Sequence, residues 1–183
     1  YKNGSYEIDF EDLETKLAQP LTTMMLLCNP HNPIGKIWDK ETLKKIGELC
    51  YKHDVLVISD EIHCDITDPG SSYVPFISVS DECKNNSITC ISPTKAFNIA
   101  GLQSSAVVTP NEKIRSRLNA AINYDEVGEA NAFAIIAAIA AFNEGETWLD
   151  ELRDYLFENK KIVANFIKEQ NLPVKLLPSN ATY

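Results

Sequence analysis

A single lysine directly follows an apolar segment in the stretch SPTKAFNIAGLQ, residues 92–103. The preceding residues 87–92 (SITCIS) have the composition of a strand, so Lys95 stands where a strand gives way to a loop. One interpretation is a solvated surface lysine, which is where most lysines lie. The other is an amine held in place for covalent chemistry, because lysine amines form Schiff bases with carbonyl compounds.

Two other apolar segments also end in polar residues. Residues 22–30 (TTMMLLCNP) lead into Asn29 and Asn32, and residues 55–60 (VLVISD) end at Asp60. A carboxylate at the end of an apolar strand is costly to bury unless a cation or a hydrogen-bond donor meets it. Asp60 alone could be a helix cap or a salt-bridge partner, or it could face a ligand.

The order of the predicted elements indicates an α/β fold with a mostly parallel sheet. The continuous apolar run at residues 55–60 is typical of a strand covered on both faces. Residues 130–144 are rich in alanine and predict a helix that is buried on most sides. The predicted strands are residues 22–30, 55–60, 87–92, 104–110 and 173–178, and the predicted helices are residues 38–54 with Asp39 as N-cap, 111–121, 130–144 and 147–171.

Ligands of open α/β sheets bind beyond the carboxyl ends of the strands. The residues after three successive predicted strands carry amides, carboxylates, a hydroxyl and an amine. We therefore expect them to face one crevice. They are Asn29 and Asn32, then Asp60 to Asp65, then Ser92 and Lys95.

Composition narrows the class of protein. The chain has 183 residues, enough for one domain with a core and part of a second. Its net charge of −9 disfavours a nucleic-acid-binding surface, and its longest apolar run is too short to span a bilayer. Five cysteines without metal-ligand spacing indicate free thiols in a reducing compartment, which predicts a cytoplasmic protein. Because the chain starts at Tyr1 and ends in LLPSNATY, we expect an internal fragment of a longer protein.

Three linked motifs carry a family resemblance: NPHNPIG (residues 29–35), SDEIHCD (residues 59–65) and SPTKAFNIAGLQ (residues 92–103). In this order and spacing they resemble fold type I pyridoxal-phosphate enzymes of the aminotransferase class I/II group. The nearest likeness is to carbon–sulfur β-lyases, the cystathionine β-lyases of the MalY/PatB type. The resemblance covers nearly the whole chain, and three motifs together are far more specific than a lone SxxK.

The resemblance implies an aspartate-aminotransferase-like large domain, a mostly parallel sheet flanked by helices, followed by the start of the small C-terminal domain. Residues 1–145 would be the partial pyridoxal-phosphate-binding large domain. Residues 146–171 would be a long connecting helix, and residues 172–183 the truncated start of the small domain.

The resemblance also implies roles for individual residues. Lys95 would carry the cofactor covalently and move the proton at the substrate Cα, and Asp60 would pair with the pyridine nitrogen. Asn32 would hydrogen-bond the ring oxygen, and Ser92 would donate to the phosphate. His63 stands where many relatives have a tyrosine that contacts the ring oxygen, so it would either bind the cofactor or cap the loop.

Other positions are expected to contribute less. Gln103 stands where most aminotransferases have an arginine that clamps the phosphate, and glutamine cannot supply that charge. Phosphate binding would then depend on neutral donors or on groups outside the chain, and the lyase branch shares this replacement. Glu61 and Asp65 are expected to be structural or solvated.

The implied reaction is α,β-elimination of L-cystathionine or L-cysteine-type substrates to pyruvate, ammonia and a thiol. An aminotransferase with the same site is the first alternative, a family member with a regulatory protein–protein role is the second, and an α/β domain without a cofactor is the third. The expected partners are a small amino-acid substrate and a second copy of the chain, with no nucleic acid and no membrane. The fragment alone is not expected to be fully active.

Overall fold

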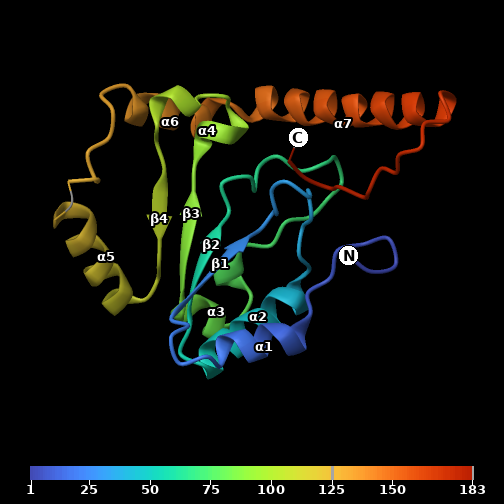
Figure 1. Cartoon of the computed structure of the whole chain (residues 1–183). Helices are drawn as coiled ribbons and strands as arrows, with labels where there is room; N and C mark the ends of the chain where they lie inside the picture. Colours follow the sequence, from blue (N-terminus) through green and yellow to red (C-terminus); the bar gives the residue numbers. More distant parts are fainter. Residues whose placement is uncertain (125, 183) are drawn as a thin grey trace.

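The computed structural model describes residues 1–124 and 126–182. Within them, four strands form one sheet in the order β1-β2-β3-β4 (Figure 1). The strands are β1 (Met24–Cys28), β2 (Leu56–Asp60), β3 (Ser87–Ile91) and β4 (Ala106–Val108). The first three run parallel and β4 is antiparallel to β3, so the prediction of a mostly parallel α/β sheet is confirmed.

The helices surround this sheet and follow the predicted order. They are α1 (Phe10–Leu17), α2 (Lys40–Lys52), α3 (Asp81–Asn85), α4 (Pro93–Ala96), α5 (Glu112–Tyr124), α6 (Ala134–Glu144) and α7 (Glu146–Glu169), with 3-10 turns η1 (Phe76–Ser78) and η2 (Ala100–Leu102). Asp39 caps α2 as predicted, because its Oδ1 accepts from the Thr42 N–H over 2.7 Å. The short helices α1, α3 and α4 were not predicted.

One predicted element is wrong. Residues 173–178 form no strand but an irregular segment. Pro173 and Pro178 bracket it, and proline has no N–H to donate to a strand ladder. Tyr183, the last residue of the predicted start of a small domain, lies outside the described residues.

The core lies on one face of the sheet, where β1 and β2 pack against α2, α3 and η1. Its fully buried members include Leu43, Ile46, Val57 and Phe76. Burial alternates along β2, because the described helices cover this strand fully on one face only. The prediction that residues 55–60 are covered on both faces is therefore wrong for the described residues.

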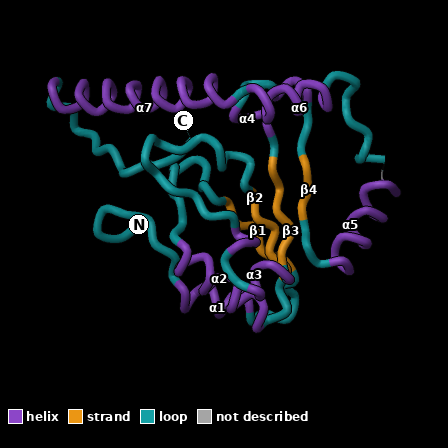
Figure 2. Tube along the Cα trace, turned by 180° about the vertical axis from the view of Figure 1, so that it is seen from behind, coloured by secondary structure: helices purple, strands orange, loops and turns teal. Residues whose placement is uncertain are grey.

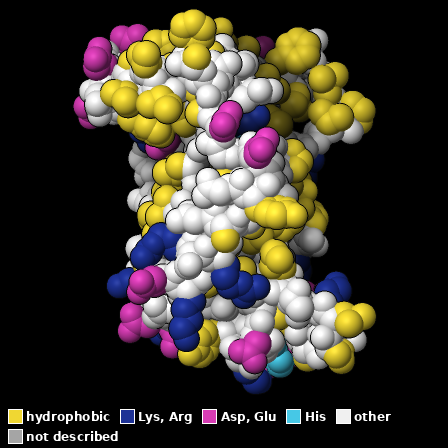
Figure 3. Space-filling view, turned by 90° about the vertical axis from the view of Figure 1, so that its left-hand side faces the viewer, with side chains coloured by type: hydrophobic (Ala, Val, Ile, Leu, Met, Phe, Trp, Pro, Cys, Tyr) yellow, Lys and Arg dark blue, Asp and Glu magenta, His cyan; other side chains and the backbone are white. Residues whose placement is uncertain are grey.

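Helix α6 is more exposed than its composition predicts. Ile135, Ile136 and Ile139 are exposed by 61%, 69% and 56%, so the predicted burial on most sides is wrong for the described residues. The helix touches α4 and α7 along one side only, where Ala134 is buried. Figure 3 shows hydrophobic side chains gathered on the upper part of the molecule, where α6 lies. Within residues 1–124 and 126–182, no helix has the length and apolar character needed to cross a membrane.

Helices α4, α6 and α7 lie in a row along the edge at which β3 ends, whereas α1, α2 and α3 gather at the opposite ends of the strands (Figures 1 and 2). The loops after β1 and β2 are tied together by the C-terminal segment. The Asn180 N–H donates to the Gly35 carbonyl over 2.9 Å, and the Asp68 N–H donates to the Asn180 carbonyl over 2.8 Å. The loops after β1 and β2 therefore lie together at one edge of the sheet.

Candidate cofactor site at the carboxyl edge of the sheet

The ends of β1, β2 and β3 lie side by side. Asp60 pairs in register with Cys28 of β1 and with Cys90 of β3. The ladder continues one step beyond the strands, where the Asn29 N–H donates to the Asp60 carbonyl over 3.0 Å and the Glu61 N–H donates to the Cys90 carbonyl over 2.9 Å. All three loops therefore leave the sheet at one place, as parallel strands predict.

Asp60 is half-buried at the centre of this edge. Its Oδ1 accepts from the Ile62 N–H over 3.2 Å, which turns the chain sharply after the strand. Burial raises the pKa of the flanking Cys28 and Cys90 thiols, and the Asp60 charge raises both pKa values further. Both thiols thus lie within the electrostatic reach of the Asp60 carboxylate.

Ser92 starts the short helix that carries Lys95. Its hydroxyl is buried, accepts from the Thr94 N–H over 3.1 Å as the N-cap of α4, and donates to the Ser104 carbonyl over 2.6 Å. The hydroxyl oxygens of Ser92 and Thr94 lie 2.6 Å apart. Because only Ser92 separates the end of β3 from the start of α4, Lys95 is held within one helical turn of the sheet edge.

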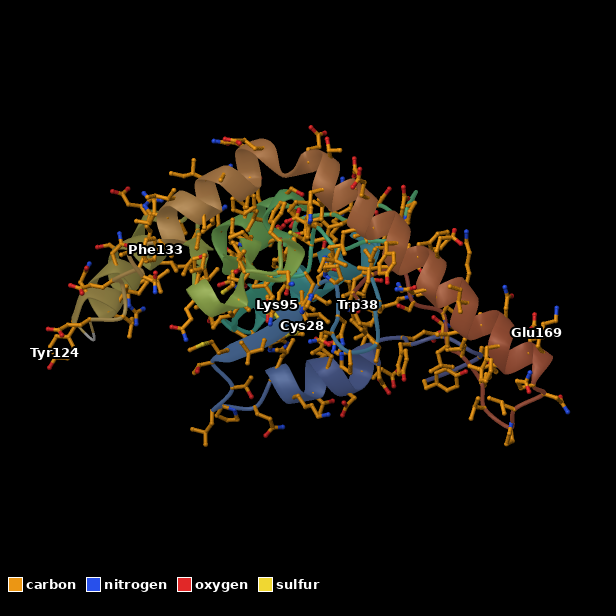
Figure 4. The ribbon with its side chains drawn as sticks, turned by 90° about the horizontal axis from the view of Figure 1, so that it is seen from above. Cys28, Trp38, Lys95, Tyr124, Phe133 and Glu169 are labelled. Carbon is orange, nitrogen blue, oxygen red and sulfur yellow. The ribbon has the colours of Figure 1, made fainter. Side chains whose placement is uncertain are left out.

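The His63 ring responds to the charges of both Asp60 and Lys95. The residue is only 5% exposed, and burial lowers the pKa of its imidazole. The positive charge of Lys95 lowers this pKa further, whereas the negative charge of Asp60 acts in the opposite direction. Both charges therefore lie close enough to act on one buried ring. Figure 4, which looks down on the molecule, labels Lys95 and Cys28 in its central part.

Two other positions singled out in the sequence, Asn32 and Gln103, are exposed. Asn32 is exposed on the loop after β1, which a backbone bridge between His31 and Lys36 closes. Gln103 is exposed after η2 in the left-handed backbone region, with φ of 53°. The structure thus places the charges of Asp60 and Lys95 within electrostatic reach of the buried His63 ring. It places Ser92 at the start of the lysine's helix and leaves Asn32 and Gln103 exposed.

Glu61 is a buried acid that the sequence did not distinguish from a solvated one. Its carboxylate is 1% exposed and accepts from Ser59 Oγ over 2.7 Å, from the Phe76 N–H over 3.0 Å and from the Tyr73 hydroxyl. Burial raises its pKa, the hydrogen bonds from Ser59 and Phe76 oppose that rise, and the Asp60 charge adds to it. The donors are distant in sequence, so only a weak signal, an acid directly after a strand, marked this residue in advance.

The fold and the residues at the strand ends are those of the pyridoxal-phosphate class of enzymes, and comparison with known proteins supports this class. The chain matches the family "Aminotransferase class I and II" over residues 1–183, and it belongs to that family. It is 46% identical to cystathionine beta-lyase PatB of Bacillus subtilis over 182 residues, covering 100% of this chain and 47% of that protein.

Solved structures of pyridoxal-phosphate enzymes share this fold. The PLP-bound C-S lyase from Staphylococcus hominis superposes with a TM-score of 0.89 at 37% identity, over 98% of this chain and 45% of its own. Cystalysin from Treponema denticola, which contains pyridoxal 5'-phosphate, superposes with a TM-score of 0.92 at 31% identity, over 100% and 46%. The chain thus spans about half the length of the relatives it matches.

The donors at the sheet edge fit this cofactor. Pyridoxal phosphate requires a lysine amine for its aldehyde carbon and an acid for its pyridinium nitrogen. Lys95 and Asp60 would supply these groups, and both charges act on His63. The Ser92 hydroxyl donates to the Ser104 carbonyl, so it would have to exchange this hydrogen bond in order to donate to a phosphate.

Proposed function

We propose that this chain is the cofactor-binding part of a pyridoxal-phosphate-dependent carbon–sulfur β-lyase. The substrates would be L-cystathionine or L-cysteine-type amino acids, which would yield pyruvate, ammonia and a thiol. The similarity to cystathionine beta-lyase PatB supports the reaction type. The observation that carries the proposal is the shared edge of the sheet, where Asp60 ends β2 in register with Cys90 of β3 and Lys95 follows β3 on α4.

In this proposal Lys95 has two roles. Its amine holds the cofactor covalently, and once a substrate amine has replaced it, the amine removes the proton from the substrate Cα. Bound pyridoxal phosphate supplies an electron sink for the resulting carbanion. Asp60 keeps the pyridine nitrogen protonated, since a carboxylate within reach of that nitrogen stabilises its positive charge.

The remaining residues bind and orient. His63 has a lowered pKa, so its imidazole is neutral at neutral pH and adds no cation to the surroundings of Lys95. Asn32 would hydrogen-bond the ring oxygen from the loop after β1. Ser92 would donate to the phosphate, and because Gln103 carries no charge, hydroxyl donors have to supply most of that binding.

The proposal extends to the organisation of the protein. Residues 1–145 would form the partial large domain, residues 146–171 the connecting helix and residues 172–183 the start of a small domain. Exposed apolar side chains on α6 support self-association as a homodimer. All five cysteines are free, which supports the cytoplasm as the location.

The experiment that tests this function uses the full-length protein with L-cystathionine, and separately with an amino donor plus 2-oxoglutarate. We expect pyruvate without any need for a keto acid. Lys95→Ala is expected to abolish both pyruvate formation and the visible absorbance of lysine-bound cofactor, whereas Lys84→Ala, at an exposed position on α3, leaves both unchanged. Formation of glutamate without pyruvate would identify an aminotransferase instead. Failure of the protein to bind pyridoxal phosphate would refute the proposal that it uses this cofactor.

A further inference from the structure

Glu61 is a buried acid next to the proposed site that has no role in the proposed reaction. Its side chain lies on the core face of the sheet and is 1% exposed. A buried carboxylate is costly unless several donors meet it. Here Ser59, Tyr73 and Phe76 all donate to it, so its position is strongly determined.

These donors come from both ends of one loop. Ser59 is in β2, whereas Tyr73 and Phe76 follow Glu61 by 12 and 15 residues. The carboxylate therefore fastens the far end of the loop to the end of β2. His63 lies on this loop and is buried together with it.

The same fastening fixes the direction of Asp60. Consecutive side chains of a strand point to opposite faces of the sheet. Ser59 and Glu61 are buried on the core face, and the half-buried Asp60 between them points to the other face. Its Oδ1 also accepts from the Ile62 N–H over 3.2 Å, so the direction of Asp60 depends on the backbone on both sides of Glu61.

We propose that Glu61 is a positioning residue, which holds Asp60 and the His63 loop in the arrangement that receives the cofactor. This inference rests on the proposed function, because it gives Asp60 the role of partner to the pyridine nitrogen. Glu61 acts through the backbone and through its three hydrogen bonds, and it does not touch the cofactor itself.

The test compares four variants of the full-length protein. Glu61→Leu removes all three hydrogen bonds, and Tyr73→Phe removes one of them with little change in volume. Glu61→Gln keeps an oxygen for Ser59 and the Phe76 N–H, while the Tyr73 hydroxyl can rotate to accept from the new amide. Leu43→Ala is the control for stability, because it destabilises the same core and removes none of the three hydrogen bonds of Glu61.

Two measurements are made on each variant. The first is the affinity of the cofactor-free protein for pyridoxal phosphate, followed by the visible absorbance of the lysine-linked cofactor. The second is the NMR titration of the His63 ring in the cofactor-free protein. The second measurement reports the burial of His63 and the charges around its ring, and it needs no cofactor.

We expect Glu61→Leu to weaken the affinity by roughly tenfold or more, as loss of a residue that orients a ligand commonly does. The His63 pKa is expected to rise toward the ordinary histidine value, because burial is the largest cause of its lowering and the released loop exposes the ring. Tyr73→Phe is expected to change both quantities in the same directions, to a smaller extent, and Glu61→Gln and Leu43→Ala are expected to keep both near those of the parent.

The proposal is overturned if Glu61→Leu and Tyr73→Phe bind the cofactor and titrate like the parent. It is also overturned if Leu43→Ala loses as much affinity as Glu61→Leu, since general destabilisation would then explain the loss. If Glu61→Leu does not fold, Tyr73→Phe decides the outcome alone. A parent protein that binds no pyridoxal phosphate refutes the proposed function instead, and the His63 titration then still tests whether Glu61 positions the His63 loop.

Discussion

Lys160 of α7 forms an ion pair with Asp68, with Nζ 2.6 Å from Oδ1, and this contact ties the long helix to the loop that leaves the site. Lys160 also lies 3.4 Å from Ser179 Oγ, in the C-terminal segment. Two turns earlier on α7, Arg153 donates to both the carbonyl and the hydroxyl of Thr67. The helix thus holds the loop at two successive residues.

Replacement of Lys160 by methionine is expected to lower the free energy of unfolding by about 1–2 kcal/mol. The two side chains are only 24% and 14% exposed, so the loss should exceed the 0–1 kcal/mol of surface pairs without reaching that of fully buried ones. Denaturant unfolding measures the change. The control is Lys161→Met, because the Lys161–Glu158 pair has the same 2.6 Å separation on an exposed surface. Equal losses in the two variants would contradict the prediction.

Gly35 is expected to tolerate no side chain. Its φ is +63°, and an added Cβ would lie 2.6 Å from the Ala181 carbonyl oxygen and closer still to the Ser179 hydroxyl. Gly35→Ala should therefore destabilise the protein by more than about 2 kcal/mol, from backbone strain and a steric clash together. Gly70→Ala isolates the strain, because φ is +81° there and the added Cβ meets open space. Thermal unfolding of both variants checks this, and a Gly70 variant as unstable as the Gly35 variant would rule out the clash.

Local sequence signals predicted which strand ends meet at one edge of the sheet. The polar residues after three apolar segments converge because parallel strands bring their carboxyl ends to one edge, and the Asp39 cap follows from local hydrogen bonding. Neither feature requires knowledge of distant contacts.

Features that depend on tertiary neighbours were not predictable in this way. The hydrophobicity of α6 predicted burial, but composition does not tell what a helix packs against, and Ile136 is 69% exposed. From the sequence, Glu61 cannot be distinguished from any other acid that follows a strand. Its donors Tyr73 and Phe76 approach it only because the loop folds back. The catalytic and cofactor-binding roles of all the site residues stay predictions. These residues are Asn32, Asp60, His63, Ser92 and Lys95.

The pKa of His63 is expected to respond in opposite directions to two charge changes. Lys95→Met removes a positive charge and should raise this pKa, whereas Asp60→Asn removes a negative charge and should lower it. NMR titration of the ring in the cofactor-free protein measures both. Shifts of the same sign, or no shift in either variant, would mean that the three side chains do not share one site.

The lowered His63 pKa also predicts a pH dependence of stability. Burial disfavours the protonated ring in the folded state, so the unfolded chain binds more protons below the ordinary histidine value of about 6.5. The contribution of His63 therefore favours folding above that value and is lost as the pH falls from there to the lowered pKa. His63→Gln is expected to weaken this loss, as followed by denaturant unfolding between about pH 5 and 8. An unchanged pH profile would be the contrary result.

Thiol alkylation is expected to separate Cys50 from Cys28. Cys50 is fully buried, and burial raises its pKa from 9.0 to about 12, which reduces the reactive thiolate roughly a thousandfold. Cys28 is only half-buried at the sheet edge, and its pKa is raised less. In the folded protein, iodoacetamide should therefore label Cys28 well before Cys50, as followed by mass spectrometry of peptides. In denaturant the two rates should converge, because both thiols then have ordinary pKa values. Equal labelling rates in the folded protein would show that the side chain of Cys50 is not enclosed between α2 and the sheet.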